Sequence, residues 1–561
     1  MRTLEQQIRQ QASESGSRVA IYLQQAGQPD LPITYAELVE SSAAFSQLYN
    51  ARGIQPGEVV VLIRQHGPEL IYAFWGAVLH GAIPSIMPFL TEKLAREQYA
   101  KDLAALIDVT RPAAIVTYPE FESEVRAAIP ANSSVRAVIS ATGDQARGAG
   151  PSTSGLGEER DPDDVVLLQH SSGTTGLQKG VALSHRAILN QLNAYSRVLG
   201  LQASDVVVSW LPLYHDMGLI AGFLLPILSG IPLVLASPFD WVRAPWRLLA
   251  AVSTYRGTLS WLPNFAYNFC TQKIRDRSLE GLDLSSWRAV INCSEPVRWE
   301  SHRAFYERFR GHGLQLSALQ TSYAMAENVF GVTQSDLSRE PTVLEIDREA
   351  FVMGGAVRLA KSQDTAMKSM SSGYPLPNTE LRILDEAGTA LPDGRMGEIS
   401  LRSDCMLSGY YHRPDADREA FRDGWYLTGD YGYLWDGELF VAGRKKDLII
   451  VGGRNIYPQD LEAISYGVAG VHPGRSVAFG VFNEETGTED VYMVVEVDTN
   501  DKRQRARMAD QIREHVTRNS NVALRYVKVV GSAWILKTSS GKTARAANRR
   551  KLLSELESLS E

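Results

Sequence analysis

Apolar residues recur along this chain in two alternating patterns. Short apolar runs such as VVLLQ (165–169), VVVSWLPL (206–213) and RAVINC (288–293) are typical of buried β-strands. Between them lie longer amphipathic stretches such as HRAILNQLNAYSRVL (185–199), which are typical of helices. Strands that alternate with helices predict βα units around largely parallel sheets, and therefore an α/β fold.

The pattern changes after Leu439. The segment 439–464 predicts a strand, a charged break, a second strand, a glycine turn and a helix that begins at Pro458, where proline is tolerated. Beyond it, the residues predict two strands within 475–498, a helix at 505–518 and a strand at 526–535. We therefore predict a large N-terminal domain over residues 1–446 and a small α+β domain over residues 447–561.

Composition and charge narrow the class of protein. A chain of 561 residues, 44% of them apolar, is too long for one core and should form several units of roughly 100–200 residues. Its formal charge of -7 implies no general attraction to nucleic acid or anionic lipid, so we expect no nucleic-acid partner. The uncharged stretch 219–239 could span a bilayer, but Pro226, Gly230 and Pro232 interrupt it. We predict a buried core segment there and no membrane span.

The cysteines and the N-terminal residues bear on the compartment. Cys270, Cys293 and Cys405 are far apart and match no zinc or CxxC spacing, so they are expected to be buried thiols in a reducing environment. The first residues form a polar, helix-like stretch without the apolar core of an export signal. The expected location is the cytoplasm. The Gly- and Ser-rich stretch 140–164 reads as an exposed loop.

A glycine-rich loop, SSGTTGLQKG (171–180), follows one predicted strand. The spacing excludes a Walker A motif, because Gln178 stands where that motif requires its second glycine. GxSxG, HExxH and a strand-linked GxGxxG are also missing from the sequence. Hydroxyls, glycines and Lys179 could fold around a polyphosphate, and by itself the loop could equally be a plain turn.

Five ordered motifs carry a resemblance that covers almost the whole chain. They are SSGTTGLQKG, SYAMAE (322–327), WYLTGDYG (425–432), GRKKDLIIVGGRNIYPQDLE (443–462) and KTSSGKTAR (537–545). Together they resemble the adenylate-forming enzymes, which include acyl-CoA ligases, luciferase and the adenylation domains of peptide synthetases. SWLPLYHDMGL (209–219), LPNFAYNFC (262–270) and NCSEPVR (292–298) look most like fatty acyl-AMP ligases.

The resemblance implies an ATP- and Mg²⁺-dependent ligase. A carboxylic acid, fatty or related, would attack the α-phosphate of ATP to give an acyl-adenylate and pyrophosphate. The acyl group would then pass to the phosphopantetheine thiol of an acyl carrier protein. Two alternatives remain open: an acyl-CoA ligase that transfers to CoA, and a non-catalytic nucleotide-binding relative, which would be expected to lack Lys542, Asp430 or Glu327.

The resemblance also assigns residues to the nucleotide. The phosphates would be held by Ser172, Gly173, Thr174, Thr175, Gly176 and Lys179. Tyr323 would stack on adenine, near Asn292 and Ser294. Asp430 would accept the ribose hydroxyls, and Arg444 would reach phosphate or ribose. Glu327 would ligate Mg²⁺, since a hard cation prefers carboxylate oxygen.

Further residues are implied for catalysis and for the acid. Lys542 would bridge the substrate carboxylate and the α-phosphate, and Lys446 matches the position about which the small domain rotates in the family. His215, Phe265 and Cys293 would lie at the acyl pocket. Without the resemblance, these residues have ordinary explanations. Lys542 would be a lysine of the basic tail, and His215 a structural histidine hydrogen-bonded beside Asp216. Tyr323 would be a core aromatic and Asp430 a turn residue.

Three departures from the family pattern modify these expectations. More than forty residues separate Asn328 from Gly373, a length that resembles the insertion by which fatty acyl-AMP ligases hinder transfer to CoA. Cys293 and Ser294 stand where the family commonly has glycine and alanine. Because this segment would line the acyl pocket, the pocket is expected to accept a narrower or differently shaped acid. Ala324 stands where glycine is usual and could change how Tyr323 lies on adenine.

Overall fold

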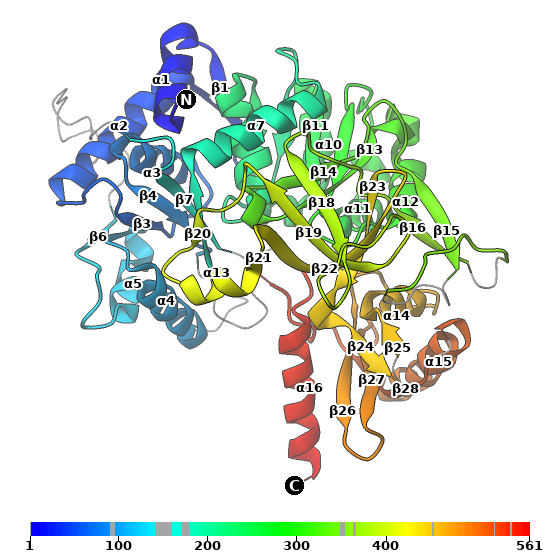
Figure 1. Ribbon diagram of the computed structural model, residues 1–561. Helices are drawn as coiled ribbons and strands as arrows, with labels where there is room; N and C mark the ends of the chain where they lie inside the picture. Colours follow the sequence, from blue (N-terminus) through cyan, green and yellow to red (C-terminus); the bar gives the residue numbers. More distant parts are fainter. Residues whose placement is uncertain are drawn as a thin grey trace.

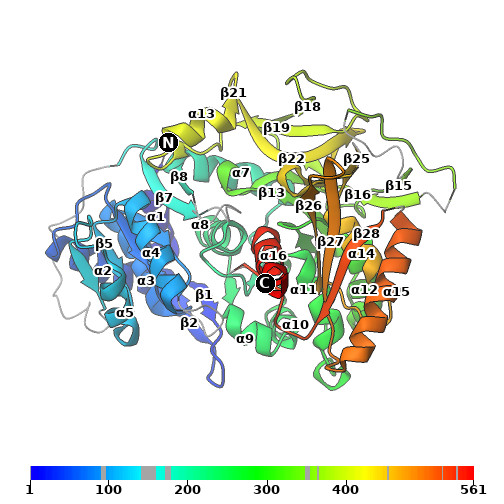
Figure 2. The same cartoon turned by 90° about the horizontal axis from the view of Figure 1, so that it is seen from below.

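The computed structural model describes residues 2–89, 96–140, 160–170, 179–347, 354–362, 366–451, 454–520, 522–538 and 541–560. The predicted fold class is confirmed: helices pack around sheets in a large N-terminal part, and a small α+β unit follows (Figure 1). In Figure 2 the blue helices of the N-terminal part and the orange helix α15 of the C-terminal unit lie on opposite sides of the molecule, and the last helix, α16 in red, lies between them. Most of the predicted loop 140–164 falls outside the described residues.

A nine-stranded sheet forms the centre of the large part. Its six middle strands, from β13 to β1, run parallel, and antiparallel strands border them on both sides. β11 and β12 are buried at every position, which explains why their residues are apolar except Ser260 and Asn292. In spatial order the strands are β17 (Tyr374–Pro375), β14 (Gly331–Gln334), β13 (Leu319–Ala324), β12 (Ala289–Asn292), β11 (Leu259–Leu262), β9 (Val207–Ser209), β10 (Leu233–Leu235), β1 (Val19–Leu23) and β2 (Leu31–Thr34).

Two smaller sheets stand near the N-terminal half. One is parallel throughout, with the order β4 (Ile83–Ile86), β3 (Val59–Leu62), β5 (Ala114–Val116), β6 (Ala137–Ile139). The other is antiparallel, with the order β20 (Gly409–Tyr410), β8 (Gly180–Ser184), β7 (Val165–His170). β7 ends at His170, directly before the glycine-rich loop.

The helices of this part follow the amphipathic stretches of the sequence. α7 spans His185–Leu199, as predicted; Ser184 caps its start and Gly200, in the left-handed conformation, ends it. The other helices are α1 (Leu4–Ser15), α2 (Tyr35–Ala51), α3 (Pro68–His80), α4 (Arg96–Thr110), α5 (Glu122–Ala128), α8 (Leu225–Ser229), α9 (Pro238–Arg243), α10 (Trp246–Tyr255), α11 (Asn264–Lys273), α12 (Trp299–Phe309) and α13 (Pro414–Ala420).

Most of the uncharged stretch 219–239 is buried, as predicted, although Ser229 and Phe239 are exposed. It contains most of a π-helix, Met217–Leu224, followed by α8, a turn at Gly230 and β10. Within the residues that the structure covers, no helix is both long and apolar enough to cross a membrane. Cys270, Cys293 and Cys405 are buried free thiols.

An antiparallel sheet between the two parts was not foreseen from the sequence, which led us to expect largely parallel sheets. Its strands are β18 (Thr379–Leu384), β19 (Gly397–Ser403), β22 (Trp425–Trp435), β21 (Phe421–Arg422) and β23 (Glu438–Arg444), which pairs with β22. Asp436 and Gly437 join β22 to β23, and both have positive φ, at 51° and 78°. An Asp-Gly pair with that geometry closes a tight hairpin, and antiparallel pairing follows.

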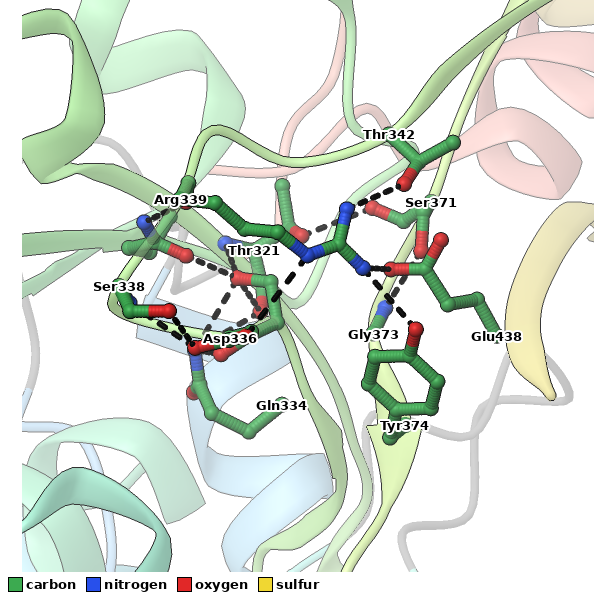
Figure 3. A network of polar contacts seen from close by, with 12 residues as sticks. Thr321, Gln334, Asp336, Ser338, Arg339, Thr342, Ser371, Gly373, Tyr374 and Glu438 are labelled. Carbon is green, nitrogen blue, oxygen red and sulfur yellow. Dashed lines mark hydrogen bonds and ion pairs between the residues drawn. The ribbon is translucent and has the colours of Figure 1, made fainter. Parts of the chain in front are cut away.

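The region of the suspected insertion contains a β-hairpin, β15 (Val343–Asp347) and β16 (Ala366–Met370). Figure 3 shows the polar network at its base. The Arg339 guanidinium donates to the buried carboxylate of Glu438 at 3.1 Å and to the Tyr374 hydroxyl at 3.0 Å. Higher up, Ile346 packs with Tyr433 and Tyr457. The hairpin therefore contacts both β22 and the segment that leads into the C-terminal unit.

The C-terminal unit has a core of its own. Its three-stranded sheet has the order β26 (Ser476–Asn483), β27 (Thr488–Glu496), β28 (Leu524–Val530), with α14 (Pro458–Ser465) and α15 (Lys502–Ser520) over one set of buried side chains. α16 (Arg545–Ser560) adds Leu552 to a second set and projects from the body in Figure 1. A short hairpin, β24 (Ile449–Val451) and β25 (Arg454–Ile456), precedes this sheet. α14 begins at Pro458, as predicted.

Candidate active site

A cavity of about 660 Å³ lies where the N-terminal sheets, the antiparallel sheet and the C-terminal unit meet. Eight of the residues singled out in the sequence line it: Lys179, His215, Ser294, Glu327, Asp430, Arg444, Lys446 and Lys542. They come from positions more than three hundred residues apart. The fold therefore gathers in one cavity the cations and carboxylates that the motifs had suggested.

The other predicted residues lie around this cavity or outside the described chain. Ser172, Gly173, Thr174, Thr175 and Gly176 belong to residues 171–178, the part of the glycine-rich loop that is outside the described residues. Asn292, Cys293, Tyr323 and Phe265 are not among the lining residues. Asn292 is buried at the end of β12 and donates to Asn264 at 3.0 Å. The roles assigned to all of these residues stay predictions.

Glu327 occupies one end of the cavity on a short 3-10 turn, Ala326–Asn328. The hydroxyl of Tyr410 donates to its Oε1 at 2.9 Å, and a second hydroxyl, of Tyr426, is 2.9 Å from that of Tyr410. Burial raises the pKa of Glu327 above its usual range, and the Tyr410 hydrogen bond opposes this only in part. A buried carboxylate held by neutral donors is well suited to receive a cation.

Lys179 lies on the same wall. Its Nζ is 4.6 Å from the centre of the Tyr410 ring, which is within the range of a cation–π contact. Lys179 is the first described residue after the glycine-rich loop. Tyr410 therefore contacts both Glu327, through its hydroxyl, and Lys179, through its ring.

Asp430 and Arg444 face each other across the β22–β23 pair. Their side chains approach to 3.6 Å, and the Tyr323 hydroxyl donates to Asp430 Oδ2 at 2.6 Å. Burial raises the pKa of Asp430, and Arg444 opposes that rise. Lys446 follows two residues later, where burial and then Arg444 lower its pKa. This part of the cavity thus combines one carboxylate with two cations.

Lys542 enters the cavity from the C-terminal unit. A tight turn shapes its approach, because Thr538 N–H donates to Lys542 O at 2.7 Å and Gly541 N–H to Thr538 O at 2.9 Å. Gly541 has φ +87°, and an added Cβ there would lie 3.4 Å from the Phe265 ring. Glycine is favoured here by the left-handed backbone, since a Cβ would make only an ordinary contact with the ring.

The Lys542 ammonium is the end of a short polar chain. Its Nζ lies 3.4 Å from Nε2 of His215, whose Nδ1 is 2.5 Å from Oδ1 of Asp216. Burial lowers the pKa of Lys542, and Asp216 and Glu295 oppose that effect. Burial alone would raise the pKa of Asp216, yet His215 and Lys542 hold it below its usual range.

The surroundings of Lys542 are aromatic and sulfur-rich. Trp210 and Trp241 are stacked, with ring centroids 3.5 Å apart and planes 5° from parallel. Phe265 meets both edge-on, and its backbone N–H donates to Glu295 at 2.9 Å. Cys293 is buried with its Sγ 2.9 Å from Sδ of Met217. Phe265 thus links the stacked indoles to the Lys542 turn, and Cys293 fills space behind Ser294.

Sequence reasoning missed two residues and undervalued a third. Tyr410 and Glu295 touch predicted site residues, but no motif assigned them a part. Glu295 lies inside the quoted NCSEPVR, so its charge within an apolar segment was a usable signal. Asp216 was seen only as a neighbour of His215. Tyr410 gave no local signal, because its contact with Glu327 spans 83 positions.

Known proteins resemble this chain along most of its length. A model of the family described as AMP-binding enzyme matches residues 8–411. A putative acyl-CoA synthetase of Caulobacter vibrioides is 30% identical over 520 residues, which are 92% of this chain and 89% of that relative. The medium-chain-fatty-acid acyl-carrier-protein ligase JamA of Moorena producens is 29% identical over 556 residues, 96% of this chain and 93% of that one.

A solved structure has the same arrangement of elements. It comes from structural and functional studies of fatty acyl-adenylate ligases from E. coli and L. pneumophila. Its TM-score is 0.90 at 28% identity, and the match covers 100% of this chain and 98% of that one. The correspondence therefore includes the C-terminal unit as well as the large part.

Proposed function

The chain belongs to the AMP-binding enzymes, so it is an adenylate-forming, acid-activating ligase, and we propose that it transfers the activated acyl group to an acyl carrier protein. The acid is a fatty or related carboxylic acid, as in the names of several relatives. The observation that carries the adenylation chemistry is the cavity lined by Lys542, Glu327, Asp430 and Arg444.

We propose that Glu327 is the protein ligand of Mg²⁺. Among the described residues no group of three or more His, Cys, Asp or Glu side chains could hold a metal ion. That fits magnesium, which commonly binds one or two carboxylates together with substrate phosphates. The bound ion would neutralise phosphate charge and favour departure of pyrophosphate. Tyr410 then orients the carboxylate, and Lys179 adds positive charge beside the phosphates.

Lys542 supplies the charge needed where two anions meet. Attack of a carboxylate on the α-phosphate brings negative charge onto neighbouring oxygens, and an ammonium group in a water-poor cavity stabilises it. Asp430 accepts the ribose hydroxyls, and Arg444 holds Asp430 in place while reaching toward the phosphates. The acid is already ionised at neutral pH, so no general base is needed.

Two observations favour a carrier protein over CoA as the acceptor. The relatives JamA of Moorena producens and TtuA of Teredinibacter turnerae carry the name acyl-carrier-protein ligase. The β15–β16 hairpin lies in the long stretch between Asn328 and Gly373, whose length resembles the insertion by which fatty acyl-AMP ligases hinder transfer to CoA. Other relatives bear acyl-CoA synthetase names, so transfer to CoA is the second candidate.

We further propose that residues 1–446 and 447–561 move as two bodies about Lys446. Lys542 blocks the cavity wall from which a thiol would approach, so it must withdraw before transfer. Few polar contacts hold the two parts together near the cavity. They include an ion pair between Arg298 and Asp460 at 3.0 Å and a hydrogen bond from Gln459 to Ala442 O at 2.7 Å.

The test is ATP–pyrophosphate exchange with straight-chain acids from acetate to hexadecanoate, for the native protein and for Lys542→Ala. Exchange that depends on one class of acid and is lost in the variant supports adenylation at this cavity. CoA and a phosphopantetheinylated carrier protein are then offered as acceptors. Faster thioester formation with CoA would contradict the proposed acceptor, and absence of exchange with every acid would contradict the proposed reaction.

A further inference from the structure

The chemistry of the Asp216–His215–Lys542 chain fixes where its protons lie. A carboxylate oxygen can only accept, so the nitrogen 2.5 Å from Asp216 Oδ1 must carry a proton. An ammonium group can only donate, so the nitrogen 3.4 Å from Lys542 Nζ must present a lone pair. We assign His215 as the neutral tautomer with its proton on Nδ1 and an acceptor at Nε2. The Met217 N–H also lies 3.4 Å from Nδ1, but its shorter hydrogen bond, at 2.8 Å, goes to Asp216 Oδ1.

Asp216 is held so that it can set this tautomer. The same Oδ1 atom accepts the N–H of Met217 at 2.8 Å, at the start of the π-helix Met217–Leu224. That helix is buried along its whole length and packs beneath β9, since an added Cβ at Gly222 would lie 2.7 Å from Ser209 Oγ. The carboxylate is thus anchored in the rigid large part, while Lys542 belongs to the other unit.

We propose that Asp216 and His215 are positioning residues that hold the Lys542 ammonium in the cavity for adenylation. Asp216 fixes the His215 tautomer, His215 Nε2 accepts a hydrogen bond from Lys542, and the Asp216 charge balances the buried cation. His215 acts as a docking point and takes no proton from the acid. The proposal rests on the proposed function of Lys542 and names the residues that make it effective.

A second carboxylate shares the electrostatic part of this task. Glu295, whose Oε2 accepts the Phe265 N–H at 2.9 Å, lies close enough to Lys542 to raise its pKa. No hydrogen bond joins Glu295 to Lys542 among the described residues, so it contributes charge without direction. His215 alone, backed by Asp216, supplies a directed acceptor.

The test separates the two half-reactions. Adenylation is followed by ATP–pyrophosphate exchange with the acid that gives the highest native rate, and transfer is followed from chemically prepared adenylate of the same acid, which bypasses Lys542. Asp216→Ala should lower kcat of adenylation about 100-fold, as expected for a misplaced catalytic group. Transfer from the supplied adenylate should change by less than about threefold, because its route does not use the positioned lysine.

Further variants separate the charge of Asp216 from its hydrogen bonds. Asp216→Asn keeps an oxygen for both donors and removes only the charge, so about a tenfold loss is expected. His215→Gln can present an oxygen where Nε2 stood and should retain more adenylation than His215→Ala. The matched control is Asp498→Asn, because Asp498 pairs with His472 at 3.5 Å on the surface, away from the cavity.

A double-mutant cycle gives the decisive result. If Asp216 works through Lys542, adding Asp216→Ala to the Lys542→Ala variant should cause little further loss of adenylation. Additive losses, or equal losses in both half-reactions, would show a merely structural role and overturn the proposal. A native protein without exchange would instead contradict the proposed function, so the two failures are distinguishable.

Discussion

Two carboxylates that line the cavity are in opposite electrostatic states. Glu327 is bonded by a tyrosine hydroxyl, and burial raises its pKa. Asp216 is equally enclosed, yet His215 and Lys542 hold its pKa below the usual range. The difference is the cation: Asp216 already has one supplied by the chain, whereas Glu327 has only neutral donors within hydrogen-bonding reach among the described residues.

This contrast suggests a division of labour between chain and ligand. Asp216 already has a cationic partner in Lys542, so the charge of this carboxylate is balanced by the chain itself. Glu327 has no cationic hydrogen-bond partner among the described residues, which favours binding of a cation together with phosphates. Substitutions that remove Lys542, Glu327 or the hydrogen-bond partners of the two carboxylates should therefore have unequal effects.

Removing Lys542, the cation that balances Asp216, should have the largest effect. Lys542→Ala is expected to lower kcat of adenylation by about 100- to 1000-fold, the usual cost of losing a group that stabilises developing charge. Transfer from supplied adenylate should be nearly unchanged. Lys528→Ala is the control, since that lysine pairs with Glu555 within the C-terminal unit. Equal loss in both half-reactions would remove Lys542 from the adenylation step.

Neutralising Glu327 should have the second-largest effect. Glu327→Gln should lower exchange about 100-fold at low Mg²⁺, with partial recovery as Mg²⁺ is raised, because a metal ligand is lost. Titrations of rate against Mg²⁺ measure the shift. Glu419→Gln alters an exposed carboxylate on the cavity wall and should leave the Mg²⁺ dependence unchanged. The same result for Glu327→Gln would argue against its role as the ligand.

A smaller effect is expected from loosening Glu327 without removing it. Tyr410→Phe deletes the 2.9 Å hydrogen bond and leaves the Lys179–ring contact in place. The loss of a hydrogen bond to a charged group, about 1.5–3 kcal/mol, corresponds to a tenfold or greater increase in the Mg²⁺ requirement. Tyr411→Phe, one residue along, serves as the control, and identical curves for the two variants would contradict this reading.

The pairing of Asp216 with Lys542 can also be tested through the pH dependence of adenylation. Lys542 must be protonated to act, and burial lowers its pKa, so adenylation should decline at alkaline pH before an ordinary lysine would titrate. Asp216 and Glu295 raise that pKa, whereas Arg444 lowers it and Cys293 raises it slightly. Asp216→Asn removes a raising charge and should move the alkaline limb to lower pH by about one unit or less.

Glu295→Gln should move this limb in the same direction, and Asp498→Asn should leave it in place. The measurement is the pH profile of exchange for all four proteins. An alkaline limb that stays fixed, or that moves to higher pH when Asp216 loses its charge, would mean that another group controls it.

The smallest effect concerns the contact between the two units. The Arg298–Asp460 pair is partly exposed and should contribute about 0.5–1 kcal/mol. Arg298→Ala is therefore expected to slow adenylation by about two- to fivefold, and to reduce its sensitivity to salt. Arg256→Ala removes an exposed pair with Asp283 inside the large unit and should do neither. Equal salt curves for both variants would show that the contact does not matter.

The sequence predicted those parts of the molecule in which local pattern decides structure. α7 and the strands at 165–170 and 289–292 follow their apolar periodicity, and α14 starts at the expected proline. The antiparallel β18–β23 sheet escaped prediction because the β19–β22 and β22–β23 pairs contain register shifts and the pairing depends on turns such as Asp436–Gly437. The resemblance to adenylate-forming enzymes pointed to Lys542 and Glu327, whereas partners from distant segments, such as Tyr410, could come only from the fold.

The stacked indoles of Trp210 and Trp241 have an optical consequence. The two indoles are buried and stacked 3.5 Å apart, so they should contribute to the near-ultraviolet circular dichroism of the protein. Phe265 lies edge-on to the pair on one side and against Gly541 on the other. Withdrawal of the Lys542 turn would relieve that contact and change the environment of the pair. The chain thus contains its own spectroscopic reporter of whether the lysine is seated.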